Sequence, residues 1–188
     1  MKKFLFTASL LVLFSVVAVA QDEEAEPVKR GFDKSKLFFG GNFGLGFGSV
    51  STLINVSPQI GYRFNRYLAA GAGVNFIYSS YKYQWEGYKE QFGVAGLNIF
   101  GRVYPIDYVF LQVQPEANFT WVKYKFDDGR PDFKLDDKIV PSLLGGIGAA
   151  IPAGRGAFIV MAQYDLLQND RSPYGNRAFF NFGYNIGL

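Results

Sequence analysis

The stretch YVFLQVQPEANFTWVK, residues 108–123, decides the fold class of this 188-residue chain. One parity of it is apolar: Val109, Leu111, Val113, Ala117, Phe119 and Trp121. The other parity is polar: Gln112, Gln114, Glu116, Asn118 and Thr120. Because successive side chains of a strand point to opposite faces, this alternation predicts a β-strand with one apolar and one polar face. A face this polar is not the core of a soluble protein, where each unpaired buried polar group costs a few kcal/mol.

The same period-two alternation recurs in seven further stretches that begin at Leu37. They cover residues 37–48, 54–63, 68–79, 95–103, 142–151, 158–165 and 179–188. Eight strands is an even number, as expected of a single-chain bacterial barrel. The sequence therefore predicts an all-β fold, an eight-stranded antiparallel up-and-down transmembrane β-barrel over residues 37–188.

The connections between these stretches alternate in length. Those after the second, fourth and sixth strands are tight: residues 64–66, 105–107 and 152–155. Those after the third, fifth and seventh are longer and polar: residues 82–90, 126–137 and 168–176. The first outer loop, residues 49–51, is a short exception. Tight periplasmic turns and longer extracellular loops are typical of outer-membrane barrels, and aromatic residues near both ends of the strands resemble two interfacial girdles.

The N-terminus reads as an export signal. Lys2 and Lys3 precede an apolar run, and Ala18-Val19-Ala20 provides a small-residue cleavage site. We therefore predict a signal peptide at residues 1–20 and a flexible periplasmic segment at residues 21–36. Loss of the two lysines would lower the formal net charge from +3 to +1, and no cluster of basic residues suggests nucleic-acid binding.

Composition argues against enzymatic chemistry. The chain has no cysteine and no histidine, which excludes disulfides, thiolate metal sites and cysteine nucleophiles and removes the commonest general base. We expect no catalytic residues, no cofactor and no resident metal. The five aspartates of residues 126–138 could bind Ca²⁺ weakly, but they lack the EF-hand spacing, and a solvated loop is the preferred interpretation.

Charged residues of the polar parity are predicted to form a network that fills the lumen. They are Arg63, Arg102, Glu116, Asp165 and Arg177. Counting across the last outer loop places Asp165 opposite Arg177, which predicts a cross-strand ion pair. An eight-stranded barrel is just wide enough for its own side chains, so we expect little conduction. The glycines of residues 40–48 fit the same narrow interior better than a phosphate loop.

The C-terminal residues NFGYNIGL, 181–188, resemble the assembly signal of small outer-membrane β-barrels of Gram-negative bacteria, the type of OmpX and the OmpA transmembrane domain. Asn181, Gly183, Ile186 and Leu188 match its positions, although Ile186 and Leu188 are aliphatic where that family usually ends on an aromatic residue. The resemblance implies insertion by the barrel-assembly machinery, contact with outer-membrane lipid and lipopolysaccharide, and a periplasmic N-terminus.

Four functions compete at this point. The first is a structural or interaction role through the extracellular loops, in envelope stability, adhesion or secretion support, with an unidentified extracellular or envelope protein as partner. The second is a narrow passive channel for small solutes. The third is an outer-membrane acyl hydrolase or protease, although the serine hydrolases of that kind need a histidine that this chain lacks. The fourth is a soluble lipocalin-like periplasmic barrel, because parity alone does not say which face is inside. The loop of residues 81–89 suits a recognition surface or an extended hairpin equally well.

Overall fold

The computed structural model describes residues 33–187. The predicted signal peptide, most of the predicted lead-in and Leu188 lie outside these residues. The described chain starts with a short 3-10 helix, η1, at Lys34–Lys36, which the sequence did not predict. Within residues 33–187, no helix is long and apolar enough to cross a membrane.

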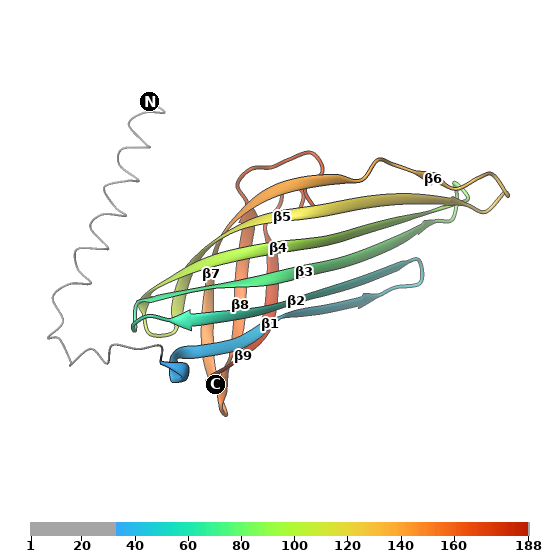
Figure 1. Cartoon of the computed structure of the whole chain (residues 1–188). Helices are drawn as coiled ribbons and strands as arrows, with labels where there is room; N and C mark the ends of the chain where they lie inside the picture. Colours follow the sequence, from blue (N-terminus) through green and yellow to red (C-terminus); the bar gives the residue numbers. More distant parts are fainter. Residues whose placement is uncertain (1–32, 188) are drawn as a thin grey trace, which may run out of the picture. The chain divides into compact units, whose positions relative to one another are not determined.

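Nine strands follow, and eight of them close a barrel (Figure 1). Their bounds are β1 Leu37–Phe47, β2 Ser51–Arg63, β3 Leu68–Tyr83, β4 Tyr88–Ile106, β5 Val109–Phe126, β6 Phe133–Lys134, β7 Lys138–Ala153, β8 Gly156–Asp165 and β9 Phe179–Gly187. Every pairing is antiparallel, and β1 pairs with both β2 and β9, so that Phe39 lies opposite Ile60 on one side and Ile186 on the other. The predicted eight-stranded antiparallel barrel is confirmed, with β6 as a two-residue addition.

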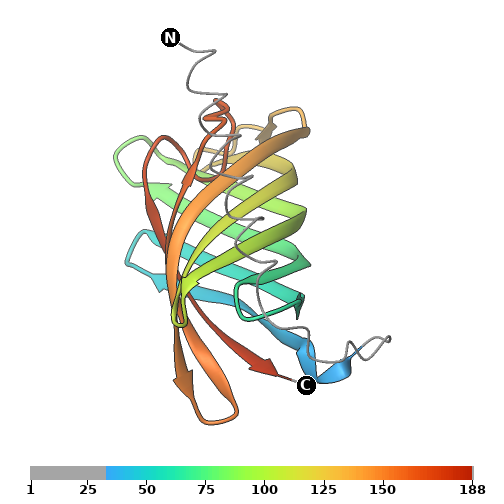
Figure 2. The same cartoon turned by 90° about the vertical axis from the view of Figure 1, so that its left-hand side faces the viewer.

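The outer connections after β5 and β8 are longer than the turns at the opposite end, as predicted, whereas the connection after β3 is not (Figure 2). Only Asp107 and Tyr108 separate β4 from β5, and only Gly154 and Arg155 separate β7 from β8. The β2–β3 turn is fixed by Asn65, whose Oδ1 accepts hydrogen bonds of 2.8 Å from the backbone N–H groups of Tyr67 and Leu68. An asparagine that bonds the backbone just ahead of it is a common way to hold a tight turn.

The second outer loop was predicted too long. The ladder between β3 and β4 continues to Tyr83 opposite Tyr88, so a four-residue turn at residues 84–87 replaces the predicted loop of residues 82–90. The strands persist because Tyr81, Tyr83 and Tyr88 pack ring against ring, with centroids 4.7 Å apart in each contact. Polar residues between the tyrosines concealed this hairpin in the sequence.

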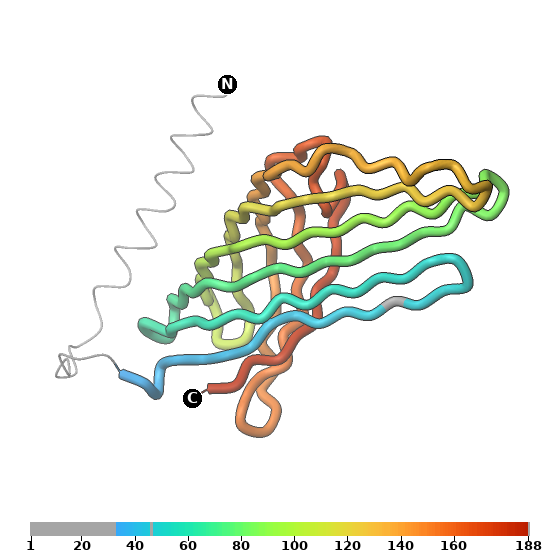
Figure 3. Tube along the Cα trace, turned by 45° about the vertical axis from the view of Figure 1, so that its right-hand side comes forward, coloured from blue at the N-terminus to red at the C-terminus, as the bar shows by residue number. Residues whose placement is uncertain are grey.

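Strand lengths differ around the barrel. β4 and β5 have 19 and 18 residues, whereas β8 and β9 have 10 and 9, so one wall is taller than the other. β5 pairs with β7 only as far as Thr120, and beyond it pairs with β6 instead. We call the part that continues past the barrel the outer extension: residues 79–83 of β3, 88–92 of β4, 121–126 of β5, and β6. Figure 3 shows these strands running on together from the barrel wall.

Burial settles which face is inside. Along β5, Gln112, Gln114, Glu116, Asn118 and Thr120 are all at most 6% exposed. The apolar residues between them face outward, with Leu111 51%, Val113 53% and Phe119 43% exposed. The barrel therefore has a polar interior and an apolar exterior, and the lipocalin-like alternative is wrong.

Candidate functional site

The lumen contains a chain of hydrogen bonds along β5. The guanidinium Nε of Arg102, on β4, donates to Gln112 Oε1; Gln112 Nε2 donates to Gln114 Oε1; and Gln114 Nε2 donates to Glu116 Oε1 over 2.7 Å. The spacing follows from the strand itself, since residues two apart lie on one face about 7 Å from each other. A buried cation and a buried carboxylate are thus connected through two glutamines.

Glu116 also receives two further hydrogen bonds. Asn118 Nδ2 donates to Oε2 over 2.9 Å, and the Tyr174 hydroxyl donates to the same oxygen over 2.7 Å. Behind Asn118, Asn98 Nδ2 donates to Asn75 Oδ1 over 2.7 Å, and Asn75 Nδ2 is 3.5 Å from Asn118 Oδ1. Side chains of β5 and the β8–β9 loop therefore donate to one carboxylate, and asparagines of β3 and β4 are linked to it through Asn118. Hydrogen bonds to a charged acceptor are about twice as strong as neutral ones.

Arg102 lies at the other end of this chain, within an apolar plug. It is 3% exposed, and its guanidinium carbon lies 4.7 Å from the Phe100 ring centroid, 4.8 Å from that of Phe110 and 5.8 Å from that of Phe38. Attraction between a guanidinium and aromatic faces offsets part of the cost of burying the charge. The plug continues with further buried side chains toward the tight turns: Ala69, Tyr104, Ala150, Ile159 and Met161.

Glycines on neighbouring strands make room for the plug. A methyl group at Gly61 would overlap the Phe38 ring, and one at Gly148 would lie 2.5 Å from Phe110 Cζ. Gly61 and Gly148 lie directly opposite Phe38 and Phe110 in the ladders. The inward glycines thus pair one by one with large inward side chains, as a narrow barrel requires.

The β8–β9 loop closes the outer end of the lumen. Asp165 is fully buried and accepts hydrogen bonds from Ser172 Oγ (2.6 Å) and from the backbone N–H groups of Leu143 and Leu167 (3.1 Å each). The Tyr174 ring stacks on Phe179 with centroids 4.6 Å apart. Burial, together with the charge of Glu116, raises the pKa of the Tyr174 phenol well above its ordinary value.

The predicted ion pair between Asp165 and Arg177 does not form. Gln163 opposite Phe179 is the last pair of the β8–β9 ladder. Arg177 lies two residues beyond it in the loop and is exposed. The register was counted correctly, but the ladder ends too early to bring the two side chains together. Asp165 is satisfied instead by a serine and by backbone N–H groups.

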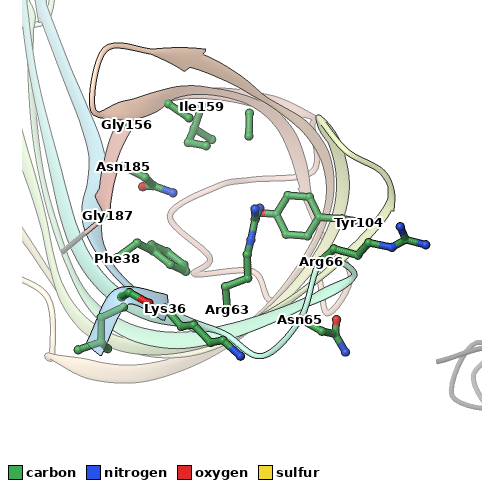
Figure 4. Close-up of a pocket in the computed structure, with 14 residues that line it drawn as sticks. Lys36, Phe38, Arg63, Asn65, Arg66, Tyr104, Gly156, Ile159, Asn185 and Gly187 are labelled. Carbon is green, nitrogen blue, oxygen red and sulfur yellow. The ribbon is translucent and has the colours of Figure 1, made fainter. Parts of the chain in front are cut away.

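The other predicted residues lie in the lumen, at the end of the barrel that carries the tight turns, or in the barrel wall. Arg102 and Glu116 belong to the hydrogen-bonded chain, whereas Arg63 lies at the end of the barrel that carries the tight turns, with its guanidinium carbon 4.5 Å from the Tyr104 ring centroid (Figure 4). Asn181 points inward and donates to Gln163 Oε1. Gly183 and Ile186 lie on β9 opposite Ile159 and Gly156, so they form part of the barrel wall.

Sequence reasoning missed the plug and the loop contacts. Phe38, Phe100 and Phe110 occupy the inward parity of their strands, next to inward residues that are polar or glycine, so parity alone was a sufficient signal for them. Tyr174 and Ser172 lie in a loop without periodicity, and no pattern in the sequence pointed to their contacts with Glu116 and Asp165.

An aromatic cluster covers the outer extension, on the face that continues the lumen lining. Tyr88 contacts Tyr83, Tyr124 and Phe126 with ring centroids 4.7, 5.9 and 6.3 Å apart, and Tyr124 stacks on Phe133 of β6 at 6.2 Å. At the tip of the hairpin, the Trp85 side chain is fully exposed. A tryptophan held entirely in solvent has no packing role in the barrel.

The aspartates of the third outer loop pair with basic side chains. Asp127 lies 3.0 Å from Lys82, Asp132 lies 2.8 Å from Lys123, and Asp137 lies 2.9 Å from Lys134. Within residues 33–187, no group of three or more acidic side chains is arranged to hold a metal ion. The loop is thus fastened to the outer extension by exposed ion pairs, each worth about 1 kcal/mol or less.

No protein-family model and no curated protein matches the chain. Among solved structures it is similar to the translocator domain of the autotransporter NalP from Neisseria meningitidis, with 11% sequence identity and a TM-score of 0.34. That similarity covers 98% of this chain and 96% of the NalP domain.

Proposed function

We propose that this protein is a non-enzymatic barrel of the outer membrane of a Gram-negative cell. In this proposal the lumen is closed and the function resides in the outer extension and loops. The single observation that carries it is the inverted distribution of side chains, with buried amides inside and exposed apolar residues outside.

The membrane location is supported by the outward-facing residues. Large apolar side chains are about half exposed on every wall, among them Phe43 61%, Leu97 67%, Ile147 54% and Phe182 60%. A soluble monomer rarely exposes so continuous an apolar surface, whereas a barrel in lipid requires one. The proposal includes contact with outer-membrane lipid and lipopolysaccharide. It also includes insertion by the barrel-assembly machinery through the C-terminal residues Asn181, Gly183, Ile186 and Leu188.

A closed lumen is supported by its contents. The plug around Arg102, the ladder along β5 and the Tyr174 loop follow one another from the tight turns to the outer end. A solute would have to break several buried hydrogen bonds to pass, each costing about 1–3 kcal/mol when left unsatisfied. This favours a closed barrel over the passive channel.

Planar-bilayer recordings test the closed lumen. Protein refolded in detergent should insert without stable, ion-selective steps of current. Refolding is checked on the same preparation by the heat-dependent shift in gel mobility that folded barrels show. Large and reproducible unitary currents from a correctly folded preparation would reject this part of the proposal.

The interaction role is supported by the outer extension. It combines the exposed Trp85 with the tyrosine cluster, and tryptophan and tyrosine are the residues most enriched at the energetic centres of protein interfaces.

The partner class is an extracellular or envelope protein. Whole-cell binding assays with Trp85→Ala should show at least a tenfold loss of partner capture. Phe47→Ala serves as the control, since Phe47 is equally apolar and 73% exposed but lies on the separate β1–β2 hairpin.

A further inference from the structure

The end of the barrel that carries the tight turns contains a cavity of about 540 Å³ that the proposed function does not use. Its walls come from η1, β1, β2, the β2–β3 turn, β4, β7, β8 and β9. The plug forms its inner end, because Phe38, Tyr104 and Ile159 line the cavity and also contact the plug (Figure 4). A cavity of this size is large enough for a ligand of drug-like dimensions.

The chemical lining is asymmetric. On one side the small side chains of Ala150 and Ala157, with Ile159, present an apolar wall. On the other side stand Lys36 and Arg63, both exposed at the mouth. In Figure 4, Arg63 reaches into the opening toward Tyr104, whereas Arg66 points away from it and is engaged by the Tyr67 hydroxyl.

Among the described residues, no acidic side chain lines the cavity. Within residues 33–187, none of the ion pairs involves Lys36 or Arg63. Behind the wall formed by Phe38 lies the buried Arg102, whose Nη1 has no hydrogen-bond partner among the described residues. Charge in a low-dielectric interior is poorly screened, so Arg102 adds to the positive potential of the cavity.

We propose that this cavity binds an amphiphilic anion, with its carboxylate or phosphate at Lys36 and Arg63 and its acyl or other apolar group against Ala150, Ala157 and Ile159. A planar guanidinium suits both head groups. The site faces away from the outer extension, so it stands independently of the interaction role proposed above.

Calorimetric titration tests this with the refolded chain in nanodiscs of phosphatidylcholine. The probes are decanoate and decyl phosphate, with decanol and citrate as the neutral and the tail-less controls, and with the heat from empty nanodiscs subtracted. Both amphiphilic anions should show saturable binding, and decanol and citrate should each bind at least tenfold more weakly. Equal affinity for decanol and decanoate would overturn the proposal.

Three variants separate the effect of charge in the cavity from the effect of its volume. Lys36→Gln with Arg63→Gln should weaken decanoate binding at least tenfold, whereas Lys34→Gln with Arg155→Gln, the same charge change at the same end but outside the cavity, should leave it unchanged. Ala157→Phe should abolish binding by filling the cavity while all charges remain. If the two double charge variants lose decanoate affinity equally, the charges of the cavity do not hold the anion. If neither Lys36→Gln with Arg63→Gln nor Ala157→Phe changes decanoate affinity, the cavity is not the binding site. Either result overturns the proposal.

Changing the lipid composition of the nanodiscs distinguishes a membrane lipid from a diffusible amphiphile as the source of the anion. If a membrane lipid is the occupant, nanodiscs containing phosphatidylglycerol should compete with decanoate in the unmodified chain but not in Lys36→Gln with Arg63→Gln. If the occupant is a diffusible amphiphile, the affinity should be the same in both lipids. Either result supports the site and assigns its ligand.

Discussion

Glu116 is a carboxylate buried in the lumen, and none of the ion pairs among residues 33–187 involves it. Gln114, Asn118 and Tyr174 satisfy it through hydrogen bonds, and Arg102 is connected to it only through Gln112 and Gln114. A buried charge without such partners would be strongly destabilising. The residue therefore ties three parts of the lumen together: the β5 ladder, the asparagine chain and the outer loop.

Replacing Glu116 with glutamine should destabilise the barrel although the shape is retained. The new amide presents an N–H₂ group where one of three donors now points, so at least one buried donor loses its acceptor, at a cost of about 1–3 kcal/mol. Urea unfolding of the refolded protein in micelles, followed by tryptophan fluorescence, measures the change. Asp136→Asn, an exposed carboxylate changed in the same way, should have no effect. Unchanged stability of Glu116→Gln would contradict the role given to this carboxylate.

Tyr174 makes closure of the outer loop sensitive to alkaline pH. Its pKa is raised in the folded state, so its contribution to stability is fully present below the ordinary tyrosine pKa of about 10 and is lost as pH rises through the folded value. In the unmodified chain, proteolysis of the β8–β9 loop should accelerate as the pH rises through the raised pKa of Tyr174 in the folded state. Tyr174→Phe should be cleaved faster at neutral pH and should lose this alkaline step. A pH profile identical in the two proteins would contradict this role of Tyr174.

At the scale of the strands, steric pairing of glycine with aromatic residues explains the plug. On β7, Gly148 leaves space for Phe110 of β5, and Gly61 on β2 does the same for Phe38 of β1. The alternation of polar and apolar residues was sufficient to predict all eight barrel strands and the start of β1 at Leu37. Apart from the register of Asp165 and Arg177, it did not predict how inward residues pair across strands, because register depends on both strands and on the loop between them.

Gly148→Ala should be destabilising because the added methyl group would lie 2.5 Å from Phe110 Cζ. Overpacking of this kind typically costs about 1–3 kcal/mol. Phe110→Leu, which removes the tip of the ring, should restore part of the loss in the double variant. Gly101→Ala is the control, since its methyl group would meet nothing within 4 Å. Urea unfolding of the four proteins gives the coupling energy, and strictly additive effects would argue against the contact.

At the scale of the whole molecule, the barrel and the outer extension depend on different interactions. The barrel rests on closure of β1 with β9 and on the lumen network, whereas the extension rests on its aromatic cluster and a few exposed ion pairs. The sequence predicted the barrel. It predicted only the first part of the outer extension's strands, because a hairpin in water needs no apolar face and its residues therefore show no clear period-two alternation. Loop contacts such as Ser172 with Asp165 depend on a fold that is already complete.

Replacing residues 82–89 by a two-residue Asn-Gly turn should shorten the extension without unfolding the barrel. No lumen hydrogen bond comes from this segment, and Asn-Gly is the favoured two-residue hairpin turn. The variant should keep its heat-dependent gel mobility and its urea midpoint, while it loses partner capture as Trp85→Ala does. A failure to fold would show that the extension is needed for the barrel.

The direction of the hydrogen bonds along β5 has an electrical consequence. From Arg102 through Gln112 and Gln114 to Glu116, every donor points the same way, so the amide dipoles add instead of cancelling. Each amide has its oxygen toward Arg102 and its N–H₂ group toward Glu116, so the amides oppose in part the field of the two charged ends. Those charges set the polarity of the interior, which is positive at Arg102, toward the tight turns, and negative at Glu116, toward the outer loops. An anion that enters from the tight turns is attracted by Arg102 and then repelled by Glu116. A cation that enters from the outer loops is attracted by Glu116 and then repelled by Arg102. A leak made by removing the plug would act as a rectifier, passing current more readily at one sign of voltage than at the other.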